Sequence, residues 1–299
     1  MDFRKLIYFH YVATYQNFTK AAEECHIAQT AMSRTIASLE EELSFTLFDR
    51  SHKRVTLTPA GRAFWEKTKL ILDTYQNAVT ESKDIASGFD HQLTIGYGGF
   101  ERQLVLRYVE GFLEQYPKTS VVVYYFSYDE MVSHLLTGKC DVVFGPANRL
   151  SSVSDLRLVE TYVSAYYLAV SSRNPLAAHK SMDAALLNNT TLVCPSEKGI
   201  YQDGVYENLC LRLGFQPGKI IHTNSTQSLL VMVELDKAMA IVPSYLLNEP
   251  RKGITLMPFR KPLPPEKIHV AAGFEHPDKQ IVRTFLDYVT EARSSVELN

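Results

Sequence analysis

The chain has 299 residues, of which 45% are hydrophobic and 21% charged, and its formal net charge is −2. This length fits about two domains of ordinary globular composition. The near-neutral charge argues against a protein that coats nucleic acid through bulk electrostatics, so any contact with DNA must come from a local patch. No apolar run is long enough to span a membrane and the first residues lack the apolar segment of a signal peptide, so we expect a cytoplasmic protein.

The first part of the chain carries three helical patterns. The apolar residues of Phe3–Ala13 follow the spacing of one buried helical face. A second helix is expected over Thr19–Glu24, where adjacent alanines permit close helix crossing, and a third over Gln29–Leu43. Only the short turn His26–Ala28 separates these two. Helices joined in this way form a helix-turn-helix, whose second helix enters the major groove of DNA.

The third helix leaves polar residues outside its apolar stripe, which consists of Met32, Ile36, Leu39 and Leu43. Amide, hydroxyl and guanidinium groups occupy its first turns, and groups of these kinds contact base edges and phosphates. The candidate DNA-binding residues of this helix are Gln29, Thr30, Ser33 and Arg34.

A short basic segment follows the third helix. Arg50, Lys53 and Arg54 lie between apolar flanks, a pattern typical of a β-hairpin wing that contacts the DNA backbone or minor groove. A solvated loop is the alternative, and it is the usual interpretation of a charge run on its own. The neighbouring helix-turn-helix favours the wing.

A long helix is expected from Thr58 to about Gly88, with Thr58 as the N-cap and Pro59 at the first helical position. Its length would be roughly 45 Å at 1.5 Å per residue. Apolar side chains recur along it at a spacing of seven residues, namely Phe64, Ile71, Ala78 and Ile85. A second copy of the helix is the natural cover for such a stripe, which predicts a dimer. Packing on the body of its own subunit is the alternative.

From Gln92 onward, β-rich runs alternate with helical stretches, which indicates an α/β domain with a largely parallel sheet. The predicted strands are Leu93–Gly96, Val121–Tyr125, Asp141–Phe144, Tyr166–Val170, Thr191–Val193, Ala240–Val242 and Ile268–Ala271. The predicted helices are Arg102–Gln115, Tyr128–Thr137, Tyr201–Leu213, Thr226–Asp236 and Lys279–Arg293.

The four cysteines are Cys25, Cys140, Cys194 and Cys210. They form no Cys-x-x-Cys pair and no histidine stands at metal-ligand spacing from them, so we expect neither a metal nor a cofactor. Reduced, mostly buried thiols are the simpler interpretation, and a redox-sensing thiol is the alternative.

Six motifs within the first 62 residues stand in a specific order. They are Phe3-Arg4-Lys5-Leu6-Ile7-Tyr8-Phe9, Asn17-Phe18-Thr19-Lys20-Ala21-Ala22, Gln29-Thr30-Ala31-Met32-Ser33-Arg34-Thr35-Ile36, Leu39-Glu40-Glu41-Glu42-Leu43, Leu47-Phe48-Asp49-Arg50 and Leu57-Thr58-Pro59-Ala60-Gly61. Together they resemble the signature of the LysR-type transcriptional regulators of bacteria. The resemblance assigns Gln29, Ser33 and Arg34 to the groove-reading helix and Arg50 to the wing.

The resemblance implies an N-terminal all-α winged helix-turn-helix and a long linker helix that forms a dimer. It also implies a C-terminal α/β effector module like the periplasmic binding proteins, with two subdomains around a cleft. Family members commonly form tetramers that bind pseudo-palindromic promoter sites and respond to a small molecule. The chain departs from the family pattern at Ala28, Thr30 and Ser44, where serine, proline or serine, and glycine are usual. A glycine pair is also replaced by Asp236–Met239, so we expect a different backbone there.

We therefore divide the chain into a DNA-binding domain (1–58), a linker helix (59–89) and an effector-binding domain (90–299). Within the last, subdomain I covers about 90–162 and 266–299, and subdomain II covers about 163–265. The chain is expected to cross between them near Thr161–Ala165 and to return, in extended form, near Leu256–Lys267.

Ligands of α/β domains bind beyond the carboxyl ends of strands, where helix N-termini present N–H groups. Four loops in such positions supply the candidate effector-binding residues, which are Gly98, Gly99, Phe100, Asn148, Ser196, Tyr201, Ser225 and Thr226. For each residue, a turn glycine or a helix cap is the alternative. Glu101 and Glu197 near these loops count against a strongly anionic ligand, and Arg102 and Lys198 partly offset them.

The expected function is that of a sequence-specific DNA-binding regulator whose promoter binding is modulated by a small-molecule effector. Its expected partners are double-stranded DNA, the effector and further copies of the chain, with RNA polymerase as a further candidate. A small-molecule-binding protein without a promoter response, including a solute-binding protein for transport, is one alternative. An enzyme is the other, although no GxSxG, HExxH, GxGxxG or P-loop pattern is present.

Overall fold

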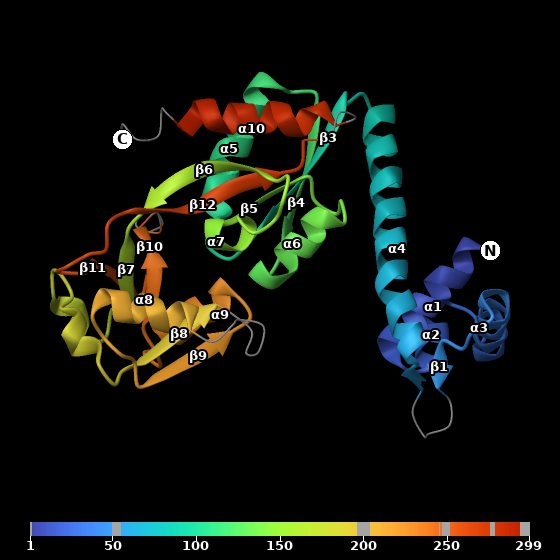
Figure 1. Ribbon diagram of the computed structural model, residues 1–299, viewed down its shortest axis with the longest axis horizontal. Coiled ribbons are helices and arrows are strands. Elements are labelled where there is room, and N and C mark those ends of the chain that lie inside the picture. Colours follow the sequence, from blue (N-terminus) through green and yellow to red (C-terminus); the bar gives the residue numbers. More distant parts are fainter. Residues whose placement is uncertain are drawn as a thin grey trace. The chain divides into compact units, whose positions relative to one another are not determined.

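The computed structural model describes residues 2–49, 55–195, 204–244, 246, 252–275 and 279–293 (Figure 1). The chain forms two compact units, Met1–Lys83 and Asp84–Asn299. Among the described helices, none combines the length and apolarity needed to cross a membrane.

The N-terminal unit is mainly helical. Its elements are α1 (Phe3–Tyr15), α2 (Phe18–Glu24), α3 (Gln29–Leu43), β1 (Phe48–Asp49), β2 (Thr56–Leu57) and most of α4 (Pro59–Ala86). Asp2 and Asn17 cap α1 and α2 by accepting backbone N–H groups. Apolar side chains from all three short helices meet in one core, which includes Phe9, Ala21 and Ile36. The predicted winged helix-turn-helix fold and long helix are thus confirmed.

Two departures from the family pattern have local consequences. Ser44 ends α3 in the left-handed conformation with φ 59°, the region that glycine enters at lower cost. Ala28 stands at the N-cap of α3 and provides no side-chain hydrogen bond. The helix therefore begins without the capping that stabilises α1 and α2.

The described strands of the C-terminal unit form three sheets. The largest has the order β4-β3-β5-β12-β6, with β3 (His91–Tyr97), β4 (Thr119–Tyr125), β5 (Val142–Pro146), β6 (Arg157–Ser164) and β12 (Glu266–Gly273). The second has the order β10-β7-β11, with β7 (Tyr166–Ser171), β10 (Ala240–Pro243) and β11 (Ile254–Pro258). The third pairs β8 (Thr191–Pro195) with β9 (Lys219–Thr223).

Helices cover both faces of the five-stranded sheet (Figure 1). The described helices of this unit are α5 (Arg102–Gln115), α6 (Tyr128–Leu136), α7 (Ala147–Leu150), α8 (Val205–Leu213), α9 (Thr226–Glu234), α10 (Gln280–Arg293) and the short 3-10 turns η1 (Pro175–Ala178) and η2 (Ala184–Leu187). On β5, Phe144 packs in the core that contains α5 and α10, and Val143 packs in the core that contains α6. This alternation is what a strand buried on both faces requires.

The prediction of a largely parallel sheet is wrong. β3 is parallel to β4 and β5, but β12 is antiparallel to both β5 and β6. β7 is likewise antiparallel to β10 and β11. Because β5 and β12 lie far apart in the sequence, no short crossover helix fixes their relative direction. The strands β6, β9 and β11 are not predicted at all, since each mixes polar and apolar residues on half-buried faces.

The chain passes from the five-stranded to the three-stranded sheet at Ala165, between β6 and β7, and returns between β11 and β12. The largest core continues across this crossing, since Ala169 and Leu230 belong to the same buried cluster as Phe144 and Phe285. Phe100 after β3 and Leu229 in the first part of α9 belong to this same cluster.

Candidate DNA-binding surface and effector site

The polar residues predicted on α3 lie away from the core. Met32, Ile36 and Leu39 have no exposed surface. Gln29, Thr30 and Arg34 are exposed, and Ser33 is half-buried. The first turns of α3 thus offer an amide, two hydroxyls and a guanidinium on the side that a groove-reading helix presents to DNA.

Two charged residues that the sequence analysis did not single out hold α3 in place. The Glu40 Oε1 atom accepts hydrogen bonds from the backbone N–H groups of Leu47 (2.7 Å) and Phe48 (3.1 Å), which fastens the wing strand to α3. Lys5 on α1 donates to Ser38 Oγ at 2.9 Å and to Glu42, and this hydrogen bond lowers the pKa of Glu42. The Lys5 contacts join two different helices, and the Glu40 contacts cross the turn that ends α3, so helical periodicity reveals neither.

The base of the predicted wing is a two-stranded hairpin in which Phe48 pairs with Leu57 and Asp49 with Thr56. Its basic residues Arg50, Lys53 and Arg54 lie outside the described residues. At the start of α4, Thr58 Oγ1 accepts from Gly61 N at 2.9 Å, as the predicted N-cap. A Cβ at Gly61 would lie 2.0 Å from the Leu47 carbonyl oxygen, so only glycine permits α4 to pack this closely on the wing.

The repeating apolar residues of α4 divide into two groups. Phe64 packs against the core of the N-terminal unit. Ile71, Tyr75 and Ile85 are 45%, 54% and 53% exposed. Large apolar side chains that stay this exposed along one helix are typical of a surface that another element covers.

Two of the four predicted effector loops meet in the structure. Gly99 follows β3, and Thr226 begins α9; a Cβ at Gly99 would lie 1.8 Å from Thr226 Oγ1. Phe100 beside them is 9% exposed. A Cβ at Gly98 would lie 2.1 Å from the Tyr128 ring, so both glycines are required for close approach.

The other predicted effector residues have different positions. Asn148 is exposed on α7, and no described contact joins it to Gly99 or Thr226. Ser225 caps α9 by accepting from Ser228 N at 3.2 Å, which agrees with the structural alternative for that residue. Ser196 and Tyr201 lie outside the described residues.

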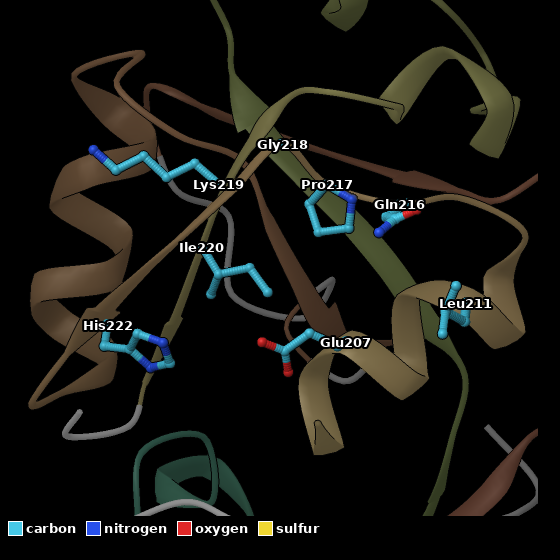
Figure 2. A pocket seen from close by; sticks show the side chains of 8 residues that line it. All are labelled: Glu207, Leu211, Gln216, Pro217, Gly218, Lys219, Ile220 and His222. Atoms are coloured by element: carbon cyan, nitrogen blue, oxygen red, sulfur yellow. The ribbon is translucent and has the colours of Figure 1, made fainter. Parts of the chain in front are cut away.

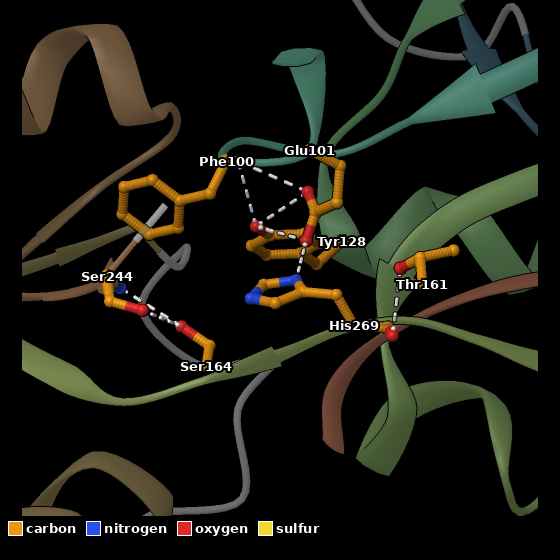
Figure 3. A network of polar contacts seen from close by, with 7 residues as sticks. All are labelled: Phe100, Glu101, Tyr128, Thr161, Ser164, Ser244 and His269. Carbon is orange, nitrogen blue, oxygen red and sulfur yellow. Dashed lines mark hydrogen bonds and ion pairs between the residues drawn. The ribbon is translucent and has the colours of Figure 1, made fainter. Parts of the chain in front are cut away.

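Glu101, which directly follows the Gly98–Phe100 loop, forms a buried acid–imidazole pair with His269 (Figure 3). This pair was not predicted from the sequence. Glu101 is 0% exposed and His269 on β12 is 3% exposed, and their Oε1 and Nδ1 atoms are 2.7 Å apart. Glu101 Oε2 also accepts from Phe100 N (3.2 Å), and the Tyr128 hydroxyl lies 3.1 Å from the same oxygen. The Glu101 carboxylate is thus bonded to its own loop and to His269, a role that was not predicted from the sequence.

Further hydrogen bonds tie this pair to the crossing between the sheets (Figure 3). Thr161 Oγ1 on β6 donates to the His269 carbonyl at 2.9 Å, and the Tyr108 hydroxyl donates to the Thr161 carbonyl at 2.8 Å. Ser164 and Ser244 join the end of β6 to the end of β10, with their hydroxyls 3.3 Å apart. The β3–α5 loop, β6 and β12 are therefore connected by buried polar contacts.

A separate surface cavity of about 310 Å³ lies between α8 and β9 (Figure 2). It is lined by Glu207, Leu211, Gln216, Pro217, Gly218, Lys219, Ile220 and His222. His222 Nδ1 lies 3.4 Å from the Sγ atom of the buried Cys194. Of the residues predicted to bind the effector, none that the structure describes lines this cavity.

All four cysteines are free thiols in the structure. Burial raises the pKa of Cys140 and of Cys210 to about 12, so both stay protonated near neutral pH. Within the described residues, no group of three histidine, cysteine or acidic side chains is placed to hold a metal ion.

Two family models match the chain. Residues 3–62 match the bacterial regulatory helix-turn-helix protein, lysR family, and residues 86–294 match the LysR substrate binding domain. The chain belongs to the LysR family. It is a DNA-binding transcriptional regulator with a C-terminal effector-binding domain, and the suspected resemblance is confirmed.

Relatives of this LysR-family chain include the transcriptional regulator BenM of Acinetobacter baylyi, which is 27% identical over 277 residues, or 91% of this chain and 90% of BenM. The regulator YcgK of Bacillus subtilis is 42% identical over 122 residues, which span 40% of this chain and 38% of YcgK. Its function is uncharacterized.

Solved structures agree with the fold over the whole chain. The LysR family regulator CbnR superimposes with a TM-score of 0.76 over 98% of this chain and 99% of CbnR, at 23% identity. Full-length CbnR in complex with its target DNA gives the same TM-score at 24% identity, over 98% of this chain and 100% of CbnR.

Proposed function

We propose that this regulator reads DNA with Gln29, Thr30, Ser33 and Arg34 of α3, and that Arg50, Lys53 and Arg54 of the wing contact the backbone or minor groove. The single observation that carries the proposal is that Gln29, Thr30 and Arg34 are exposed on the first turns of α3, whereas Met32, Ile36 and Leu39 are fully buried. The target is a pseudo-palindromic promoter site in double-stranded DNA. CbnR, a protein of the same fold, has been solved with its target DNA, which supports this role.

The test is selection of binding sites from random DNA with the full chain, followed by footprinting. A recovered site with two inverted half-sites is the expected result. Sequences without a shared motif, bound with the same affinity as random DNA, would contradict sequence-specific recognition.

The chain works as a dimer through α4, and two dimers form a tetramer. The exposed Ile71, Tyr75 and Ile85 on α4 support this arrangement. One copy of the DNA-binding domain would bind DNA weakly, because it has few basic groups. Dimerisation therefore strengthens DNA binding by joining two such domains. The regulator acts in the cytoplasm, where RNA polymerase is a further candidate partner.

The effector binds in the C-terminal unit beside Gly98, Gly99, Phe100 and Thr226, with Asn148, Ser196, Tyr201 and Ser225 as further candidates. The contact between the β3–α5 loop and the start of α9 supports this location, because the loop follows a strand of the five-stranded sheet and α9 follows β9 of another sheet. An effector that prefers one relative arrangement of these parts shifts the population toward it, and DNA binding changes through linkage. Footprints that stay identical with and without a bound effector would contradict this mechanism.

A further inference from the structure

The hydroxyl of Thr226 is buried without a hydrogen bond. Thr226 is 3% exposed, and its Oγ1 atom has no partner in the part of the chain that the structure describes. Neighbouring groups are satisfied, since Ser225 Oγ accepts from Ser228 N and the Thr226 backbone N–H binds the Tyr125 hydroxyl. Burial of an unsatisfied hydroxyl lowers stability, so its presence at the start of α9 needs an explanation.

The backbone of Gly99 covers this hydroxyl. A Cβ at position 99 would lie 1.8 Å from Thr226 Oγ1 and 3.1 Å from Thr226 Cβ, so any larger residue would displace one of the two segments. Glycine offers no polar side-chain atom in return. The contact therefore excludes solvent from the hydroxyl and leaves its hydrogen-bonding capacity unused.

We propose that the Thr226 hydroxyl is the polar anchor of the effector, and that effector binding moves the Gly99 loop away from the start of α9. This inference rests on the effector function proposed above. The ligand group would carry an acceptor oxygen, which suits both the hydroxyl and the positive end of the nine-residue helix α9. To bond Thr226, that oxygen needs the space that Gly99 now occupies.

Displacement of the Gly99 loop would alter its contacts with other elements of the C-terminal unit. Glu101 connects the same loop to His269 on β12, and His269 is bonded to Thr161 on β6. Both strands lead to the crossing between the sheets. A ligand on Thr226 thus acts on a loop that Glu101 connects to β12 and, through His269, to β6.

The first test compares two buried threonines in the full chain. Thr226→Val removes the unsatisfied hydroxyl and keeps the branched shape. Thr161→Val, the matched control, removes a hydroxyl that is equally buried but bonded to the His269 carbonyl. We expect Thr226→Val to raise the folding equilibrium constant roughly five- to hundredfold, and Thr161→Val to lower it by a similar factor. Urea unfolding followed by far-UV circular dichroism measures both. A Thr226→Val variant destabilised as much as Thr161→Val would overturn the inference.

The second test uses thermal-shift measurements on the full chain with a panel of small carboxylates, ketones, amides and amino acids at millimolar concentration. A compound that raises the Tm of the wild type, Thr226→Ser and Thr161→Val should bind Thr226→Val at least tenfold more weakly. Equal affinity for Thr226→Val would overturn the anchor and leave the effector function standing. If no compound stabilises any of these proteins, ligands of these oxygen-bearing classes are excluded and the anchor fails, whereas the effector-binding domain that the family model identifies is unaffected.

Discussion

The buried pair of Glu101 and His269 permits a quantitative prediction. His269→Leu removes the imidazole, whose Nδ1 atom at 2.7 Å is the closest partner of the Glu101 carboxylate. The carboxylate stays 0% exposed, with the Phe100 N–H at 3.2 Å and the Tyr128 hydroxyl at 3.1 Å as its remaining donors. Both lie near the long end of the hydrogen-bond range and do not replace the lost partner. Removal of one member of such a pair costs about 3–5 kcal/mol, and we expect this loss in the unfolding free energy of the C-terminal unit.

A double variant tests the reasoning. Glu101→Gln replaces the carboxylate by a neutral amide of nearly the same shape, which needs less solvation once His269 is gone. We expect Glu101→Gln with His269→Leu to be less destabilised than the sum of the single variants, by about 1–3 kcal/mol. Urea unfolding by far-UV circular dichroism gives these values. Trp65 is the only tryptophan and lies in the N-terminal unit, so its fluorescence follows that unit separately. Simple additivity would refute the argument that the two groups act as a pair.

Three further predictions concern the N-terminal unit. Arg34→Ala should weaken binding to a DNA site selected with the wild-type chain by about 1–3 kcal/mol at fixed salt, and unchanged affinity would remove Arg34 from the proposed contacts. Ser44→Gly should stabilise the unit by about 0.5–1 kcal/mol in Trp65 fluorescence, because φ is 59° at this residue; a loss of stability would show that the serine side chain makes a larger contribution. Burial, assisted by the charge of Lys69, holds the pKa of His10 below its usual 6.5. The unfolded chain therefore binds a proton more readily than the folded one, and stability falls as the pH drops below about 6.5. His10→Asn should flatten this decline, and parallel pH curves would contradict the assignment.

Local patterns were sufficient to predict the N-terminal unit. The bounds of α3, Gln29–Leu43, agree with the prediction, because the apolar stripe and both ending turns lie within one short segment. The turn geometry where other residues replace the family's glycines was not predicted, since a different backbone was expected at Asp236–Met239. Ser44 takes the left-handed conformation in place of the usual glycine, and so does Asp236, with φ 56°, in the turn before β10. Both residues thus adopt the left-handed backbone conformation, although neither is a glycine.

The site in the C-terminal unit depends on contacts that no local pattern contains. Glu101 and His269 are 168 residues apart, and they meet because β12 lies beside β5 in antiparallel direction. The β12 strand could be predicted from the sequence but its direction could not, so the partner of Glu101 could not be found. The rule that ligands bind beyond the carboxyl ends of strands did predict candidate residues in the loop of Gly99 and at the start of α9. Those two segments are in contact in the structure. Two loops that the structure brings together could thus be predicted from the sequence, but the buried hydrogen-bond network next to them could not.

The exposed stripe on α4 decides whether the proposed dimer exists. Ile71 is 45% exposed, whereas Phe64 is already packed in the core of its own unit, so Ile71 can be changed without disturbing that core. In a symmetric dimer one Ile71→Glu substitution places two carboxylates in the same apolar interface, which should dissociate it. Gln76→Glu adds the same charge at an exposed polar position of α4 and serves as the control. Sedimentation velocity at matched concentration separates the outcomes. If the Ile71→Glu variant remains a dimer, Ile71 packs against its own subunit and does not lie in a dimer interface. A monomeric Ile71→Glu variant should instead lose DNA affinity although α3 is unchanged, because specific binding then depends on the pairing of two weak contacts.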